Sequence, residues 1–480
     1  MVRRAALALC AVAACGDAAP VLAPVIEAPA PPSEADPFPN LEELGMAVAL
    51  AGDDRDLVAA RFERGETVEL PGIPYADDLV VHLEGLTGAA QTAYGRTCSF
   101  DLRPSVPPPS PHLYFARPVK WADAPRAPAR VRIGGWALVA ADGSGLFGGG
   151  ETAADPMPVA EIDRFDPRTG EASEPVPLEP RTGAAAARLG DGRIVIIGGV
   201  DPGTGGAAAF VELVDPLAGI VDRIDDAGLR VARVGLATAA LADGRVVAIG
   251  GEPPAGGPTG SVVAIRADGG SLELRPVRAA LAFPRADATA TRLSDDIGAP
   301  VLVVGGRGAD GKPIAEAELY KPLREAFADP LTFTAKLSAP RSRHAAVRMP
   351  DGSVLVVGGV DGDGVAVRTM ELFSPDGGFA PVGALPDDAG VVDMSVTTLP
   401  DGRVLLAGGR APGGPPLDTA FIARLDPLDG SVDLVGTDRL TRPRAGHQAL
   451  TLCDGTVLLA GGTADEAPAE RYNPPPNGRR

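Results

Sequence analysis

Positive charge is scarce in this chain of 480 residues. Lys and Arg together number 44 against 63 Asp and Glu, which gives a formal net charge of -19 at pH 7. A nucleic-acid backbone and an anionic membrane surface both attract clustered Lys and Arg, so this balance argues against either one as the main partner. The chain also has only four His and four Cys. These counts leave few side chains from which a transition-metal site could be built.

Long apolar runs are missing as well. The start of the chain, "MVRRAALALCAVAAC", has two arginines and then an apolar stretch, far shorter than the ~20 residues that span a bilayer. Such a start is typical of an export signal. The stretch Val12-Ala13-Ala14-Cys15 resembles the lipobox of bacterial lipoproteins. This resemblance implies that residues 1–14 are a lipoprotein signal peptide and that Cys15 is the lipid attachment site; ordinary cleavage or a chance match is the alternative.

Packable side chains are few in residues 15–39, where Ala, Pro and acidic residues predominate. Proline stiffens such a segment and little apolar surface is available for folding, so we expect 15–39 to be a Pro/Ala-rich tether. Residues 40–105 contain short β-like runs such as "DLVVHLEGL", separated by Gly, Pro and Asp. They predict a small β-sandwich-like domain that ends at the proline-rich segment "RPSVPPPSPH".

Glycine, by contrast, is abundant and regularly placed. Glycine pairs begin at seven nearly evenly spaced positions: Gly148, Gly198, Gly250, Gly305, Gly358, Gly408 and Gly461. A repeat of about 50 residues is typical of a β-propeller. Each copy contains one strand, a hairpin turn such as Asp351-Gly352, an apolar strand that ends in the glycine pair, and further strand-like runs. Four strands make one propeller blade, so residues 112–476 are predicted to form seven blades.

These copies resemble the kelch family. Kelch repeats carry an apolar run that ends in Gly-Gly, which this chain keeps, and a Tyr and a Trp, which it usually replaces with Phe, Leu or Val. The resemblance covers 112–476 and implies an all-β fold, namely a seven-bladed kelch-type β-propeller preceded by the small β-sandwich-like domain. Because the seventh copy lacks a fourth strand, we expect the strand at 112–121 to close blade seven and remove an open edge. Truncation before residue 125 should then destabilise the propeller.

No catalytic motif stands out in the chain. The kelch family, which this chain resembles, includes copper oxidases that hold their metal with two tyrosines and two histidines. This chain offers four histidines: His82, His112, His344 and His447. The last two fall at matching positions of their copies, which favours packed inner-strand residues over metal ligands. The Ser-x-Asp-x-Gly-x-Thr-Trp box of sialidase propellers is missing. We therefore assign no catalytic residue, metal or cofactor, and expect a binding function in preference to an enzyme.

Cys98 and Cys453 are the two cysteines that remain after the lipobox and the signal. An even pair in an oxidising compartment can form a bridge. Cys453 lies at the first hairpin of blade seven, and the chain that leaves Cys98 soon enters the outer strand of the same blade. The intervening proline linker could equally hold the two thiols apart, so a disulfide stays one of two alternatives.

Arginine recurs at one fixed distance before most glycine pairs, as Arg181 does before Gly198, and slightly farther before the fourth pair. The first and sixth copies have Val131 and Val391 at this position. The predicted arginine set, with a neighbouring residue included, is Arg181, Arg233, Arg285, Arg341, Arg343 and Arg444. At the start of the innermost strands these side chains would ring the mouth of the channel, where guanidinium groups bind carboxylates and phosphates. Inter-blade salt bridges are the alternative interpretation.

Together these features predict a lipid-anchored binding or scaffold protein of the bacterial cell envelope. We expect an outer-membrane lipoprotein that faces the periplasm or the exterior and touches the membrane through its lipid alone. Its propeller, as a monomer, would present loops to a protein or glycan ligand, and the arginines favour an anionic one; no nucleic-acid partner is expected. The alternative is a carbohydrate-active kelch-type enzyme, either a sugar oxidase or a mutarotase.

Overall fold

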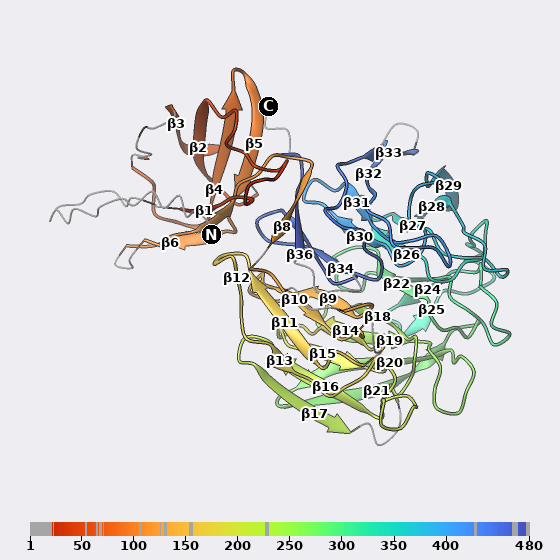
Figure 1. The fold of residues 1–480 in the computed structure, drawn as a ribbon. Helices are drawn as coiled ribbons and strands as arrows, with labels where there is room; N and C mark the ends of the chain where they lie inside the picture. Colours follow the sequence, from red (N-terminus) through yellow and green to blue (C-terminus); the bar gives the residue numbers. More distant parts are fainter. Residues whose placement is uncertain are drawn as a thin grey trace.

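The protein is all-β. The computed structural model describes residues 22, 24–52, 55–63, 66, 70, 72–104, 108–124, 126–128, 132–152, 157–225, 230–426, 430–462 and 469–476. Every regular element in these ranges is a β-strand, and nearly all strand pairs are antiparallel (Figure 1). The described ranges contain no helix long and apolar enough to cross a membrane. The predicted signal peptide at 1–14 and the predicted lipid site Cys15 lie outside them.

Seven of the sheets repeat one plan, in which a first, second, third and fourth strand pair in that order. The first strands are β9 (Trp136–Val139), β14 (Ala185–Arg188), β18 (Ala237–Ala240), β22 (Thr289–Arg292), β26 (Ala345–Arg348), β30 (Ser395–Thr398) and β34 (Gln448–Thr451). The second strands are β10 (Gly145–Gly148), β15 (Ile194–Ile197), β19 (Val246–Ile249), β23 (Val301–Val304), β27 (Val354–Val357), β31 (Val404–Ala407) and β35 (Val457–Ala460). The third strands are β11 (Glu161–Asp166), β16 (Phe210–Asp215), β20 (Ser261–Asp268), β24 (Glu318–Lys321), β28 (Thr369–Ser374), β32 (Ala420–Leu425) and β36 (Ala469–Asn473). The fourth strands are β12 (Glu171–Ala172) together with β13 (Val176–Pro177), then β17 (Ile220–Asp225), β21 (Ser271–Ala280), β25 (Ala326–Phe327), β29 (Gly378–Ala384), β33 (Val432–Gly436) and β8 (Lys120–Ala124).

The first strands of the seven sheets lie next to one another in cyclic order. Each contacts the first strand of the following sheet, and β34 of the seventh sheet contacts β9 of the first. In Figure 1 the first strands gather at the centre, whereas fourth strands such as β17, β21 and β29 lie at the periphery. We call this arrangement the ring.

The glycine pairs allow neighbouring sheets of the ring to approach closely. Gly198 and Gly199 follow the fully buried strand β15 and have φ values of 65° and 84°, which glycine adopts without strain. A Cβ atom on Gly198 would lie 2.4 Å from the carbonyl oxygen of Arg233 in the next sheet. Any larger residue would therefore push two sheets apart, which explains why the apolar run of each copy ends in glycine.

The Asp-Gly turns between the first and second strands are also built alike. In the second sheet Asp191 Oδ1 accepts a hydrogen bond from the backbone N–H of Arg193, with an N···O distance of 3.1 Å, and Gly192 has a φ of 92°. The same carboxylate-to-amide bond closes the turns that begin at Asp142, Asp243, Asp351, Asp401 and Asp454. The same type of turn, closed by the same side-chain hydrogen bond, thus recurs at one end of the ring, which explains the recurring Asp-Gly sequences.

A separate body precedes the ring. It is a five-stranded antiparallel sheet made of β2 (Glu43–Leu50), β3 (Asp56–Glu63), β4 (Ala76–Thr87), β5 (Ala90–Arg96) and β6 (Phe100–Leu102). Against it lies a two-stranded parallel sheet of β1 (Val25–Glu27) and β7 (His112–Tyr114), and both sheets contribute to one core that includes Val48, Val81 and Leu113. The expected two-layer domain at 40–105 therefore recruits strands from both sides of that range.

Part of the predicted tether at 15–39 packs against the N-terminal body. Strand β1 pairs with β7, while Leu22 and Ala35 are buried. Leu22 and Ile26 provide the apolar surface that docks this segment, although the average composition of the segment is poor in such residues. The tether expectation is thus corrected for residues 24–39.

The strand predicted at 112–121 is divided between the two bodies. Residues 112–114 pair with β1, whereas Lys120–Ala124 forms β8, the fourth strand of the seventh sheet, beside β36. Trp121 packs against Tyr472 of β36, with ring centroids 4.7 Å apart and the rings tilted by 40°. A segment from before the first sheet thus completes the last one, but it begins later than predicted, at residue 120 rather than residue 112.

Candidate functional site

The predicted arginine set divides into five buried members and one exposed member. Arg181, Arg233, Arg285, Arg341 and Arg444 are each at most 3% exposed. Their guanidinium groups bond atoms of their own sheets and do not face solvent. The expectation that these five bind a ligand is therefore corrected, and the structural alternative fits, with the bonds lying within each sheet rather than between blades.

Arg341 illustrates how these arginines act. Its Nη2 atom donates to Glu371 Oε1 at 2.6 Å, and its Nη1 atom donates to the carbonyl oxygens of Gly358 and Thr369 at 3.2 and 2.7 Å. Glu371 also accepts the backbone N–H of Ser338 at 2.7 Å. The pair thus fastens the entry loop, the glycine pair and the third strand to one another. Equivalent carboxylates are Glu212, Glu318 and Glu470.

A sixth buried arginine was missed by the spacing rule. In the first sheet the two glycines with positive φ are Gly149 and Gly150, whereas Gly148 is the last residue of β10. Arg132 precedes Gly149 by the regular distance of the other copies; it is 1% exposed and donates to Asp163 at 2.5 Å. The run of three glycines allowed two registers, and counting from Gly148 gave Val131 where counting from Gly149 gives Arg132. Val131 lies outside the described residues.

Arg343 is the exposed member of the set, with 48% of its side chain accessible, but it is not free. Its guanidinium forms an ion pair with Asp393 at 2.9 Å. Arg343, Asp287 and Asp393 occupy equivalent positions in three consecutive sheets and have φ values of 56° to 57°, where the other four sheets place glycine. At the end of the ring where the first strands begin, Arg343 is therefore neutralised by its neighbour.

The histidines do not converge on a metal site. His344 Nε2 lies 3.0 Å from Thr289 Oγ1, and His447 Nε2 lies 2.8 Å from Ser395 Oγ, so each imidazole bonds the preceding sheet. Burial lowers the pKa of both imidazoles to about 3, which keeps them neutral. His82 and His112 lie elsewhere, beside Tyr94 and Glu27. Among the described residues, no group of three His, Cys, Asp or Glu is placed to hold a metal ion.

The two bodies are covalently joined. Cys98 and Cys453 form a disulfide with their Cα atoms 5.0 Å apart, so the structure selects the bridge from the two alternatives. The side-chain amide of Asn473 in β36 also donates to the carbonyl oxygens of Tyr94 and Ala116, at 2.9 and 2.8 Å. The N-terminal body is therefore attached beside the seventh sheet of the ring.

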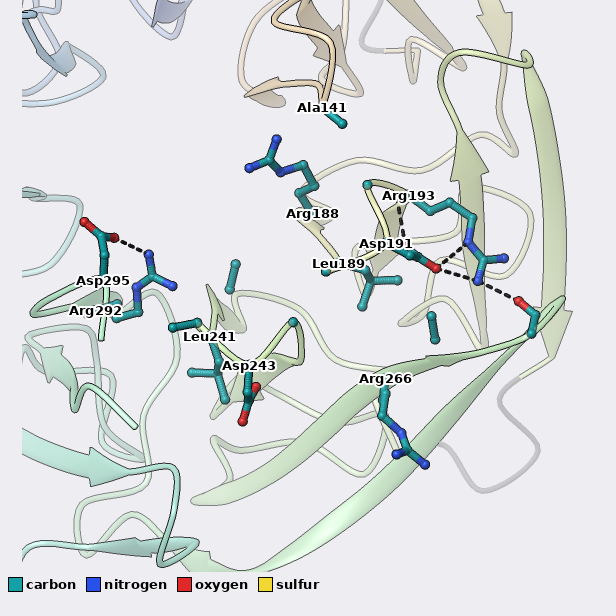
Figure 2. A pocket seen from close by; sticks show the side chains of 17 residues that line it. Ala141, Arg188, Leu189, Asp191, Arg193, Leu241, Asp243, Arg266, Arg292 and Asp295 are labelled. Atoms are coloured by element: carbon teal, nitrogen blue, oxygen red, sulfur yellow. Dashed lines mark hydrogen bonds and ion pairs between the residues drawn. The ribbon is translucent and has the colours of Figure 1, made fainter. Parts of the chain in front are cut away.

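A cavity of about 1010 Å³ opens at the end of the ring where the first strands end. The Asp-Gly turns of the second and third sheets form much of its wall, and the first and fourth sheets complete it. Figure 2 shows Arg188 extending into this space, between the Arg292–Asp295 pair on one side and Asp191 with Arg193 on the other. The sequence does not reveal this site: Arg188 and Arg292 end the first strands β14 and β22, and their local sequence does not show which guanidinium has a carboxylate beside it after packing.

The carboxylates around the cavity are all occupied by neighbouring arginines. Asp191 pairs with Arg193 at 2.8 Å, and Asp243 pairs with Arg245 at 2.7 Å. Asp295 is shared by Arg292 at 2.5 Å and by Arg348 at 2.7 Å. Arg188, in contrast, has no hydrogen-bond or ion-pair partner for its guanidinium in the part of the chain that the structure describes. Among the described residues, Arg188 is therefore the one arginine of the cavity lining without a partner.

Comparison with known proteins identifies a fold and no family. No protein-family model matches this chain, and no curated protein has a matching sequence. A solved structure that resembles it is a fungal alcohol oxidase of the AA5 family in complex with copper, with a TM-score of 0.52 and 17% sequence identity. The match covers 74% of this chain and 76% of that one. At this identity the likeness concerns the fold alone.

Proposed function

We propose that this chain is a lipid-anchored binding protein of the bacterial cell envelope, in which the ring is a seven-bladed kelch-type β-propeller. The cyclic order of the first strands and the glycine pair of each copy support the propeller. The lipobox-like stretch that ends at Cys15 supports the anchor. The observation that carries the binding function is the cavity at one end of the ring, with the unpartnered Arg188 inside it.

Lipid attachment is tested with the full chain and a Cys15→Ser variant. Metabolic labelling with a fatty acid should mark the wild-type chain in the membrane fraction, and the variant should be unlabelled and recovered in the soluble fraction. Label that persists in the variant would contradict the anchor.

Ligand binding is tested by capture on glycan and protein panels. Ala240 lines the cavity and is exposed, so Ala240→Trp should fill the space without disturbing a buried core. We expect the wild-type chain to retain a panel member that the variant loses. Equal retention by both chains would place binding elsewhere, and no retention by either would contradict the proposal.

A sugar oxidase is the second candidate, and the fold likeness to a copper-bound alcohol oxidase supports it. The described residues do not match a copper site, because the four histidines lie in separate places and Cys98 and Cys453 are bonded to each other. Copper titration of the full chain, followed by an assay in which an alcohol is oxidised to an aldehyde and O₂ is reduced to hydrogen peroxide, distinguishes the two candidates. Peroxide release in proportion to bound copper would favour the oxidase.

A further inference from the structure

The residue at the end of the first strand forms the cavity floor in three consecutive sheets. Arg188, Ala240 and Arg292 occupy this position in β14, β18 and β22, since each pairs with the first residue of the following second strand. These three strands are direct neighbours in the ring. The short side chain of Ala240 thus leaves a space between two arginines, and that space is part of the cavity.

The two arginines differ in how they are held. Arg188 is exposed and has no partner among the described residues, so its charge is available to a ligand. Arg292 shares Asp295 with Arg348, and Asp295 would keep Arg348 as its partner if Arg292 turned towards a ligand. The hydrogen bond from Arg348 lowers the pKa of Asp295, so this carboxylate remains charged and does not compete for the proton of an acidic ligand. Recruitment of Arg292 therefore leaves no isolated carboxylate behind.

The remaining wall consists of charged side chains, the main chain of the turns and small side chains such as Ala141, Ala242 and Ala267. The cavity lining contains no aromatic residue, and its two leucines, Leu189 and Leu241, are buried at 3% and 6% exposure. An apolar or aromatic ligand group would find little surface to cover, whereas hydroxyl groups can bond the charged side chains and the exposed main chain of the turns. Pockets of roughly 300–1,000 Å³ accept small molecules, and this cavity of about 1010 Å³ has room for a short saccharide.

We propose that the cavity binds an acidic sugar through its phosphate or carboxylate group, which Arg188 holds first and Arg292 holds second. A guanidinium group presents two parallel N–H donors that match the two oxygens of either oxyanion. The chain as a whole carries a charge of -19, so an arginine that has no partner among the described residues is a local positive site in a negative protein. This inference rests on the proposed binding function and specifies the ligand class of the same cavity.

Isothermal titration of the full chain tests the inference with three probes: glucose 6-phosphate, digalacturonate and the neutral disaccharide lactose. We expect one or both of the acidic probes to bind and lactose not to bind, and the tighter acidic probe identifies phosphate or carboxylate as the preferred oxyanion. Arg188→Gln should weaken binding of that probe at least tenfold, because a charge-assisted bidentate contact is lost. Arg188 is exposed and has no partner in the described part of the chain, so the thermal midpoint of this variant should equal that of the wild type.

Arg343→Gln is the matched control, because it removes the same charge from an exposed residue at the opposite end of the ring. It should leave the affinity unchanged. Equal weakening by both variants would indicate a general effect of charge and would overturn the inference, as would unchanged binding in Arg188→Gln. If no acidic probe binds but the capture panels retain a ligand that Ala240→Trp loses, the inference fails and the proposed function stands. If neither assay finds a ligand, both fail.

Discussion

At the scale of single residues, the buried arginines act as structural fasteners. Arg341 and Glu371 are both 0% exposed, so neither charge is solvated by water and each depends on the other. A buried ion pair adds little to folding stability compared with an apolar pair of similar volume. Removal of one partner, however, leaves the other as an unpaired buried charge. The sixth sheet supports this comparison within the chain, since it carries Val391 and Phe421 at the two equivalent positions.

Arg341→Val should therefore lower the free energy of unfolding by about 3–5 kcal/mol, because Glu371 is left buried without its cation. The double variant Arg341→Val with Glu371→Phe reproduces the pair of the sixth sheet and should recover a large part of this loss. Urea unfolding measures both values. Arg266→Val, which breaks an exposed pair with Glu273, is the control and should change stability by less than about 1 kcal/mol. A double variant that is less stable than Arg341→Val would contradict the account.

The two buried histidines predict a loss of stability in acid. The pKa of His344 and His447 is about 3 in the folded protein, whereas an unfolded histidine titrates near about 6.5. The contribution of these groups to the free energy of unfolding is complete above about pH 6.5 and decreases as the pH drops towards about 3. The reason is that the unfolded chain binds protons in this range whereas the native imidazoles stay neutral. Each histidine contributes about 1.4 kcal/mol per pH unit in that window.

Urea unfolding at about pH 5.5 and 4 should show this slope in the wild type. The double variant His344→Gln with His447→Gln should have a slope smaller by roughly 2.7 kcal/mol per pH unit, since the carboxylates contribute to both chains alike. Between about pH 7 and 8 the two chains should show the same slope. Identical slopes in the acid range would mean that the imidazoles are not kept neutral.

The sequence located individual residues well where local geometry decides and poorly where register decides. The glycines and the Asp-Gly turns were found because a positive φ and a short hydrogen-bonding side chain are local requirements. Arg132 was missed because three consecutive glycines concealed a shift of one residue. Arg188 was missed for another reason: a free guanidinium is recognised by the absence of a carboxylate nearby, which only the packed structure reveals.

At the scale of elements, closure of the seventh sheet depends on β8, which comes from before the first sheet in sequence. Its Trp121 is 3% exposed and packs against Tyr472, and the strand covers the free edge of β36. The sequence predicted that such a strand exists because the seventh copy is one strand short. It could not separate β8 from β7, since both are short strands within one segment bounded by prolines, and their partners, β36 and β1, lie in distant parts of the chain.

Two truncations isolate the contribution of β8. A chain that begins at residue 117 lacks the N-terminal body and keeps β8, whereas a chain that begins at residue 125 lacks both. The second chain should have the lower thermal midpoint, because it exposes the edge of β36 and the ring of Tyr472. In the longer chain, Trp121→Ala should cost about 3–5 kcal/mol, as expected for truncation of a buried aromatic side chain. Equal midpoints for the two truncated chains would show that β8 does not close the ring.

At the scale of the whole molecule, the N-terminal body meets the ring beside the seventh sheet and also at Gly170 of the first sheet, where a Cβ atom would lie 2.5 Å from His112. The contacts beside the seventh sheet include the disulfide between Cys98 and Cys453, two hydrogen bonds from Asn473, and Arg471, whose guanidinium lies 4.2 Å above the ring of Tyr114 and 3.6 Å from the carboxylate of Glu27. Each neutral hydrogen bond contributes about 0.5–1.5 kcal/mol net, so the disulfide is the strongest single connection. It also fixes the part of the chain from which β8 departs towards β36.

Removal of this connection should separate the unfolding of the two bodies. The double variant Cys98→Ser with Cys453→Ser should lose about 2–5 kcal/mol, because the unfolded chain is no longer restricted by a bridge between distant parts of the sequence. Scanning calorimetry should then show the N-terminal body unfolding at a lower temperature than the ring, whereas the oxidised wild type unfolds with the two transitions closer together. Mass spectrometry of non-reduced peptides verifies the bridge in the wild-type chain, and added reductant should reproduce the variant's trace. The role given to the disulfide would be refuted by a variant whose transitions match those of the oxidised wild type, because the remaining contacts would then be enough to hold the N-terminal body to the ring.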